Sequence, residues 1–156
     1  MYKDLPVRKN IRMQGYDYSC AGCYFITICV QDKHELLGEV GAISNRPYVQ
    51  LSEIGKIAKN ALSKVNENIT LDKYVIMPNH VHMIVRIENS GRTEFAPTMS
   101  SIIRFYKSYT TKQIGYSIWQ KSFHDHIIRN EAEYQKIWKY IDENPMCWKE
   151  DEYYTK

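Results

Sequence analysis

The sequence contains no long apolar segment. None of its apolar runs approaches the roughly 18 residues that a membrane-spanning helix needs, and residues 1–4 lack the apolar core of a signal peptide. We therefore expect a cytoplasmic protein. Internal repeats, low-complexity tracts and linkers are also absent, and 156 residues suffice for one core. A single domain over residues 1–156 is expected.

Cysteine is scarce and lacks a metal-binding or disulfide pattern. The chain has 4 cysteines, and Cys20-x-x-Cys23 has no second pair that would complete a zinc ribbon. In a reducing compartment these residues are best interpreted as free thiols. Metal binding or redox activity of the Cys20–Cys23 pair is the alternative.

Charge of one sign is also limited, whereas aromatic residues are plentiful. The net charge of +3 is compatible with nucleic-acid binding but does not require it. Aromatic rings are the largest apolar side chains, so many of the 13 tyrosines should lie in the core, and some can stack on bases. Residues 1–18 form a basic arm with interspersed tyrosines, which suits phosphate contact and base stacking. A solvated N-terminal tail is the alternative.

The hydrophobic patterns predict an alternation of strands and helices. Pattern, caps and turn residues place strands at 22–31, 69–77, 80–87 and 118–129, helices at 51–66, 98–113 and 130–143, and turns with a short hairpin at 32–50. The first six of these strands and helices have the βαββαβ order of a ferredoxin-like α+β fold. We expect an antiparallel sheet with helices packed on it and an extra C-terminal helix.

Two histidines lie at the start of the third predicted strand. Side chains alternate between the faces of a strand, so His80 and His82 project side by side. Two neighbouring imidazoles can take two positions on one divalent metal ion. The alternative is that both histidines face one side of a sheet without a function. A metal site requires a third ligand and a reactive group elsewhere.

The last predicted helix carries a tyrosine outside its apolar stripe. At about 100° per residue, Tyr140 lies roughly 110° from the stripe's centre, and Asn144 follows one turn later. Both can reach one site if the helix packs against the histidine strand; a half-exposed surface tyrosine is the alternative. Pro145 ends the helix and biases Asn144 away from helical geometry. The apolar stripe itself consists of Tyr134, Ile137, Trp138 and Ile141.

Several of these segments resemble a known family. Met77-Pro78-Asn79-His80-Val81-His82 resembles the signature of HUH endonucleases with a single catalytic tyrosine. Tyr140-Ile141-x-x-Asn144-Pro145 is similar to REP-associated tyrosine transposases, and nearly the whole chain shares the likeness. Two further similar segments are Trp119-Gln120-x-x-Phe123-x-x-His126-x-Ile128-Arg129-Asn130 and Gly15-Tyr16-Asp17-Tyr18-Ser19.

This resemblance implies roles for four residues. His80 and His82 would bind Mg²⁺ or Mn²⁺, Asn144 would be the third ligand, and Tyr140 would be the nucleophile. The implied activity is nicking and rejoining of single-stranded or hairpin DNA through a 5′-phosphotyrosine intermediate. We expect a monomer with its active site in one subunit; a dimer that exchanges the tyrosine helix is the alternative.

Other residues are weaker candidates. Tyr106, Tyr109 and Tyr134 are interpreted as core residues rather than nucleophiles, and Asp125 and His126 as possible lining of the site. Solvated surface charge is the alternative for each basic residue below. The candidate DNA-binding residues are Arg8, Lys9, Arg12, Arg104, Lys107, Lys112, Lys121 and Arg129.

Two other functions are compatible with the same elements. A nucleic-acid-binding module with an RRM-like sheet would present stacking aromatics on an open sheet face and would not bring His80, His82, Tyr140 and Asn144 together. A replication-initiator nickase would use the same chemistry. The short chain shows no helicase or oligomerisation segment, which disfavours the second alternative.

Overall fold

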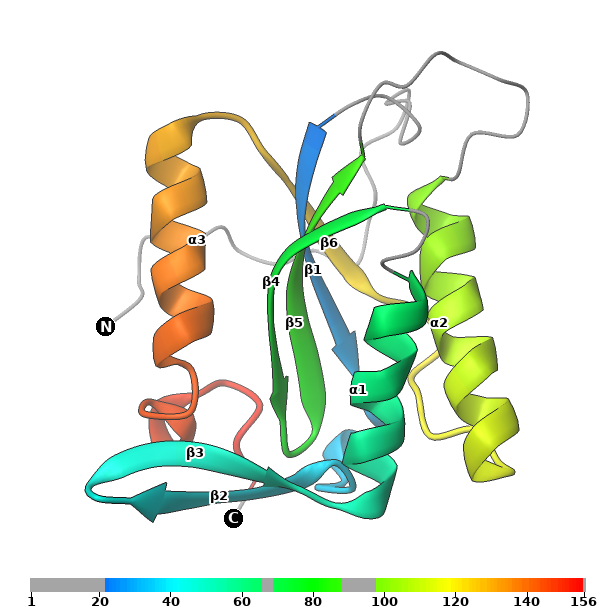
Figure 1. Cartoon of the computed structure of the whole chain (residues 1–156), viewed down its shortest axis with the longest axis vertical. Helices are drawn as coiled ribbons and strands as arrows, with labels where there is room; N and C mark the ends of the chain where they lie inside the picture. The colour runs from blue at the N-terminus through cyan, green and yellow to red at the C-terminus, as the bar shows by residue number, and fades with distance from the viewer. Residues whose placement is uncertain (1–21, 66–68, 88–97, 156) are drawn as a thin grey trace.

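A four-stranded antiparallel sheet organises the described part of the chain, residues 22–65, 69–87 and 98–155 of a computed structural model (Figure 1). The strand order is β4-β5-β1-β6, and every neighbouring pair is antiparallel. This order is that of the ferredoxin-like fold, so the predicted α+β class is confirmed. The strands are β1 (Gly22–Cys29), β4 (Thr70–Met77), β5 (His80–Ile87) and β6 (His124–Ile128).

The predicted short hairpin is also present. Strands β2 (Gly38–Ile43) and β3 (Arg46–Leu51) form a separate two-stranded sheet. Its two turn residues, Ser44 and Asn45, have φ values of 50° and 64°. Left-handed backbone at both positions matches the twist of a tight hairpin.

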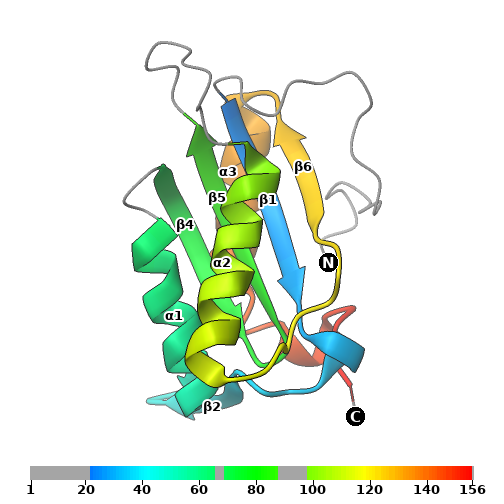
Figure 2. The same ribbon diagram turned by 90° about the vertical axis from the view of Figure 1, so that its right-hand side faces the viewer.

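Helices cover both faces of the four-stranded sheet. Helices α1 (Glu53–Val65) and α2 (Met99–Ile114) pack on one face and α3 (Glu131–Glu143) on the other (Figures 1 and 2). Thr98 and Asn130 cap the starts of α2 and α3 with side-chain oxygens that accept backbone N–H groups. In the described ranges, no helix is both long enough and apolar enough to cross a membrane.

Strand alternation decides which side chains lie under α3. From Tyr24 onward, β1 is buried on both faces, and its even-numbered residues Tyr24, Ile26 and Ile28 join the core beneath α1 and α2. The odd-numbered Phe25 packs instead with residues of α3. On β5 it is the even-numbered residues that lie on the α3 face. His80 and His82 are paired there with Cys29 and Thr27 of β1.

The last strand is shorter than the sequence predicted. The predicted strand 118–129 is regular only over β6, because the chain leaves the sheet between Trp119 and His124. Trp119 makes an isolated bridge to Val30, while its indole N–H donates to Thr110 of α2 at 2.6 Å. In this segment the Lys107 ammonium donates hydrogen bonds to the carbonyl oxygens of Gln120 and Ser122, which in a regular strand would accept from a neighbouring strand.

Gly55 lets α1 approach the segment that precedes β2. A Cβ atom at this position would lie 1.9 Å from the carbonyl oxygen of Leu37, which is backbone and cannot rotate away. We expect Gly55→Ala to lower the free energy of unfolding by about 2 kcal/mol or more, since this clash exceeds the roughly 1 kcal/mol helix-propensity gain of alanine.

Denaturant unfolding measures this loss, with Gly41→Ala as the control. A Cβ at Gly41 would meet only the Tyr48 ring, at 3.5 Å, an ordinary contact. If Gly55→Ala is as stable as Gly41→Ala, the close approach of α1 to Leu37 is wrong.

Candidate active site

A tight turn holds the first histidine in place. Pro78 and Asn79 connect β4 to β5, with Met77 and His80 paired across the ladder. The carbonyl oxygens of Pro78 and Asn79 accept the N–H groups of Leu37 and Val30, both at 2.9 Å. His80 therefore begins β5 directly after a turn whose two carbonyl groups are both hydrogen-bonded to other segments.

The two histidines are buried next to each other under α3. His80 and His82 are both 0 % exposed, and their ring centroids are 4.5 Å apart. The Nδ1 atom of His80 lies 2.8 Å from Asn79 Oδ1, and that of His82 lies 2.8 Å from Thr27 Oγ1. With both Nδ1 atoms engaged in this way, the Nε2 atoms are the nitrogens suited to a metal ion.

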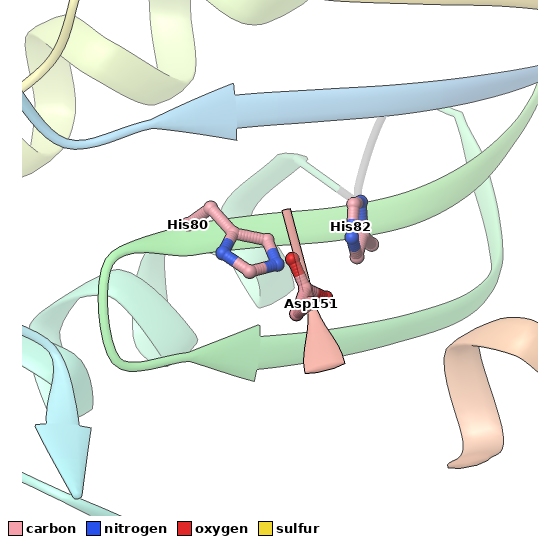
Figure 3. A group of neighbouring side chains, drawn as sticks. All are labelled: His80, His82 and Asp151. Carbon is pink, nitrogen blue, oxygen red and sulfur yellow. The ribbon is translucent and has the colours of Figure 1, made fainter. Parts of the chain in front are cut away.

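A carboxylate from the C-terminal segment joins the histidines. Candidate ligand atoms of His80, His82 and Asp151 all lie within 4.8 Å of one another, and Figure 3 shows Asp151 beside both imidazoles. Asp151 follows the short helix η2 (Trp148–Glu150), whose Trp148 ring lies 6.0 Å from that of His80. Tyr153 packs closer still, with its ring centroid 4.4 Å from that of His80.

The donor set fits a divalent cation. A metal ion with ligand bonds of about 2.1 Å separates its ligand atoms by at most about 4.2 Å, so small side-chain movements would close the group. Carboxylate oxygen suits Mg²⁺ and Mn²⁺, and imidazole nitrogen is a common ligand of divalent transition metals. Asn144, the ligand that the family resemblance implies, has a buried Oδ1 that makes no hydrogen bond to any described residue.

Tyr140 is more buried than the apolar stripe predicted. Its side chain is 8 % exposed and packs in one cluster with Phe25, Ile84, Ile137 and Ile141. The buried face of α3 is thus rotated toward Tyr140. The opposite edge of the helix meets β4 instead, where Lys73 lies 4.8 Å from the Trp138 ring centroid and Tyr134 bonds to Asp72.

This rotation brings Tyr140 to the histidines. Its ring centroid lies 5.3 Å from that of His82 and 6.0 Å from that of Phe25. The structure therefore brings three of the four candidates, His80, His82 and Tyr140, into one cluster.

Asn144 differs from the prediction in its backbone. It keeps helical angles, with φ −57° and ψ −44°, although Pro145 follows, so the expected departure from helix is wrong. Its N–H donates to Ile141 at 3.3 Å and its side chain is 1 % exposed, which hold the residue in the helical turn. Asn144 stays on the buried side of α3, one turn after Tyr140.

The alternative tyrosines occupy structural positions. The Tyr106 hydroxyl donates to the Ala58 carbonyl oxygen at 3.1 Å, and complete burial raises its pKa. The Tyr134 hydroxyl donates to Asp72 at 2.8 Å; partial burial and that carboxylate raise its pKa. A raised pKa disfavours the phenolate, so neither hydroxyl is suited to attack.

The two candidates on β6 face opposite sides of the sheet. Asp125 is paired with Ile26, whose side chain lies in the core under α1 and α2, so Asp125 does not line the histidine site as predicted. His126 is paired with Phe25 and is on the histidine face. Its Nε2 pairs with Glu133 near the start of α3, which ties that helix to the edge strand.

Most candidate DNA-binding residues of the described chain gather in one groove. Arg104, Lys107, Lys112 and Lys121 line a groove of about 710 Å³ with polar residues and Phe123. Because α2 forms its wall, the groove belongs to the layer on the other face of the sheet from the histidines. Arg129 is exposed beside α3. Arg8, Lys9, Arg12 and Cys20 lie outside the described residues.

Two of these basic residues have structural bonds. The Lys107 ammonium donates to the carbonyl oxygens of Gln120 and Ser122 at 2.7 and 2.9 Å, and burial lowers its pKa to about 8. The Arg129 N–H donates to Glu133 at 2.9 Å, but its guanidinium is exposed. Arg104, Lys112 and Lys121 are the more accessible charges of the groove.

Sequence reasoning missed Asp151 and the bonding partners of the histidines. Asp151 has no spacing relation to His80 or His82, and the fold of the segment that follows α3 brings it near. Thr27 becomes a partner of His82 through the β1–β5 register. The polar Asn79 between a proline and a histidine was the one visible signal, since a buried turn amide needs partners.

Two proteins of known sequence are similar to this chain. An uncharacterized protein of Haemophilus influenzae is 31 % identical over 172 residues, covering 95 % of this chain and 93 % of its own. A "Putative REP-associated tyrosine transposase" of the same organism is 23 % identical, covering 83 % of this chain and 73 % of its own. No protein-family model matches the chain.

A solved structure shares the fold. It is a REP-associated tyrosine transposase bound to a REP hairpin, with a TM-score of 0.64 and 24 % sequence identity. The match covers 87 % of this chain and 72 % of that one.

Proposed function

This chain belongs to the family of REP-associated tyrosine transposases, and from that membership we propose that it nicks and rejoins DNA. The proposed substrate is single-stranded or hairpin DNA, and the proposed intermediate is a 5′-phosphotyrosine bond. The observation that carries the proposal is the placement of Tyr140 against His82, with 5.3 Å between their ring centroids.

The residues divide into a nucleophile and a set of ligands. His80 and His82 would hold Mg²⁺ or Mn²⁺, with Asn144 and Asp151 as the candidates for further ligands. The bound ion would neutralise the negative charge that builds on the phosphate during attack. Both imidazoles are buried, so their orientation toward the ion would be fixed by packing.

Tyr140 would carry out the covalent step. Its phenol oxygen attacks the phosphorus, the bond between phosphorus and the 3′ oxygen breaks, and the DNA 5′ phosphate becomes attached to the tyrosine. The phenol loses its proton to solvent or a base, and the departing 3′ oxygen takes one up, so the step is proton-neutral. The new ester conserves the bond energy, and a 3′-hydroxyl can reverse the step without ATP.

We propose that one subunit builds the whole site. Tyr140, His80, His82 and Asp151 come together within a single chain, which supports attack in cis. A monomer would then suffice for catalysis. A dimer that exchanges α3 would need to break the contacts of Ile137 and Ile141 with Phe25 and Ile84 first.

The groove on α2 would bind the DNA backbone. Arginine and lysine supply most phosphate contacts, and three accessible cations line this groove. Because the groove and the histidines lie on different faces of the sheet, we propose that it holds DNA away from the position that is cut.

Removing charge from the groove should weaken DNA binding without regard to sequence. We expect Arg104→Ala/Lys112→Ala to reduce the slope of log affinity against log salt concentration by about 2, one unit for each lost phosphate contact. Fluorescence anisotropy with a labelled hairpin at several salt concentrations measures this slope. Lys56→Ala/Lys59→Ala on α1 is the control; an equal effect there would mean that the groove is no special surface.

The RRM-like alternative is disfavoured by the layers of the fold. Such a module stacks bases on an open sheet face. Here α1 and α2 cover one face, and α3 covers the other with Tyr140 and Ile141. Within the described ranges, the sheet offers no such open aromatic platform.

A labelled hairpin oligonucleotide tests the proposed function. With Mg²⁺ or Mn²⁺, we expect a cleaved strand and a protein–DNA adduct that survives SDS gel electrophoresis. With EDTA, both should disappear. Tight hairpin binding with neither cleavage nor adduct in either metal would favour a binding module instead.

A further inference from the structure

The turn residue Asn79 is 1 % exposed, and its side chain makes three hydrogen bonds. Its Nδ2 donates to the carbonyl oxygens of Lys33, at 3.2 Å, and Tyr153, at 2.7 Å. Its Oδ1 lies 2.8 Å from Nδ1 of His80. Burial of the amide requires hydrogen-bond partners, but it does not determine which groups these are.

These partners fix which way the amide points. Carbonyl oxygens only accept hydrogen bonds, so the atom that faces Lys33 and Tyr153 must be the NH₂ group. The remaining amide atom, Oδ1, also only accepts. Nδ1 of His80 must therefore donate, and it must carry the proton. In a neutral imidazole this leaves Nε2 with the lone pair that a metal ion requires.

The same amide also holds the segment that carries Asp151. Its bond to the Tyr153 carbonyl anchors the chain two residues after Asp151. The Tyr153 N–H donates in turn to Asp151 Oδ1 at 2.8 Å. One side chain thus connects the imidazole of a β-strand to the carboxylate of the C-terminal segment.

We propose that Asn79 is a positioning residue that sets the His80 tautomer for metal binding and docks the C-terminal segment so that Asp151 faces the histidines. This inference rests on the proposed function for its metal. It assigns to the turn a role beyond the connection of β4 to β5. Partners that orient a ligand imidazole typically change metal affinity by about 10- to 100-fold.

The tautomer can be measured without metal and without DNA. In ¹⁵N-labelled protein, the side-chain nitrogen shifts of a neutral histidine distinguish protonated Nδ1 from protonated Nε2. At about pH 8.5 a histidine of ordinary pKa is neutral. We expect His80 of the wild-type protein to be protonated at Nδ1 and Asn79→Ala to show the other tautomer or a mixture. The Mn²⁺ affinity of Asn79→Ala should be about 10- to 100-fold lower than that of the wild-type protein.

A second variant separates the two roles and covers poor folding of the first. Asn79→Asp keeps an acceptor for His80 but loses the donor to Tyr153. It should retain the Nδ1–H tautomer, while the amides of residues 153 and 154 exchange with solvent faster. Asn60→Ala, which removes an exposed amide of α1, should change neither readout.

The outcomes distinguish this inference from the proposed function. An Nε2-protonated His80 in the wild-type protein, or an unchanged tautomer in folded Asn79→Ala, would overturn the positioning role. A wild-type protein that binds no Mn²⁺ would overturn the proposed metal site, and with it the metal-binding part of this inference. The tautomer readout would still decide whether Asn79 orients His80.

Discussion

Replacing Tyr140 by phenylalanine should abolish the protein–DNA adduct and lower strand cleavage by roughly a thousandfold or more, since the covalent step then lacks its nucleophile. The ring would remain in place against Phe25 and His82, so the fold should be retained. The adduct is measured on SDS gels with a labelled hairpin. The melting temperature of the variant should stay close to that of the wild-type protein.

Tyr134→Phe is the matched control on the same helix. It removes a hydroxyl that bonds to Asp72 rather than one near the histidines. We expect normal adduct formation with a stability loss of about 1 kcal/mol, the usual value of one hydrogen bond. An adduct with Tyr140→Phe but none with Tyr134→Phe would transfer the nucleophile to Tyr134.

Replacing His80 by alanine should also stop cleavage. Loss of this candidate ligand would weaken metal binding and remove stabilisation of the transition state, which should lower the rate about a thousandfold. Cleavage should be assayed across a wide range of Mn²⁺ concentrations, because partial recovery at high Mn²⁺ would indicate a binding defect.

The control for His80 must have comparable burial. Cys29 is paired with His80 across the β1–β5 ladder and is 2 % exposed, so Cys29→Ala perturbs the same place but leaves both imidazoles in the protein. We expect Cys29→Ala to cleave normally and both variants to unfold cooperatively. Wild-type cleavage by a folded His80→Ala protein would remove His80 from the metal site.

Local patterns were sufficient to predict most of the fold. Buried β-formers indicated β1, and the stripe of α1 and the cap of α3 placed those helices within a few residues. The alternation of β5 placed His80 and His82 on one face. These features depend on neighbours in the sequence, which is why the sequence reveals them.

Features that depend on packing were harder to predict. The rotation of α3 that buries Tyr140 comes from the contacts of Trp138 and Tyr134 with β4, which no helical period contains. Asp125 was misplaced because the exact start and register of β6 decide its face. Asp151 reaches the histidines through the C-terminal segment, so its proximity has no local signature.

Mapping the adduct tests the central claim most directly. Wild-type protein is incubated with the hairpin oligonucleotide and Mn²⁺, digested with a protease and a nuclease, and examined by mass spectrometry. We predict a nucleotide attached to Tyr140 through its 5′ phosphate and a free 3′-hydroxyl on the released strand. A nucleotide attached to any other residue, or cleaved DNA without a covalent protein intermediate, would contradict the account.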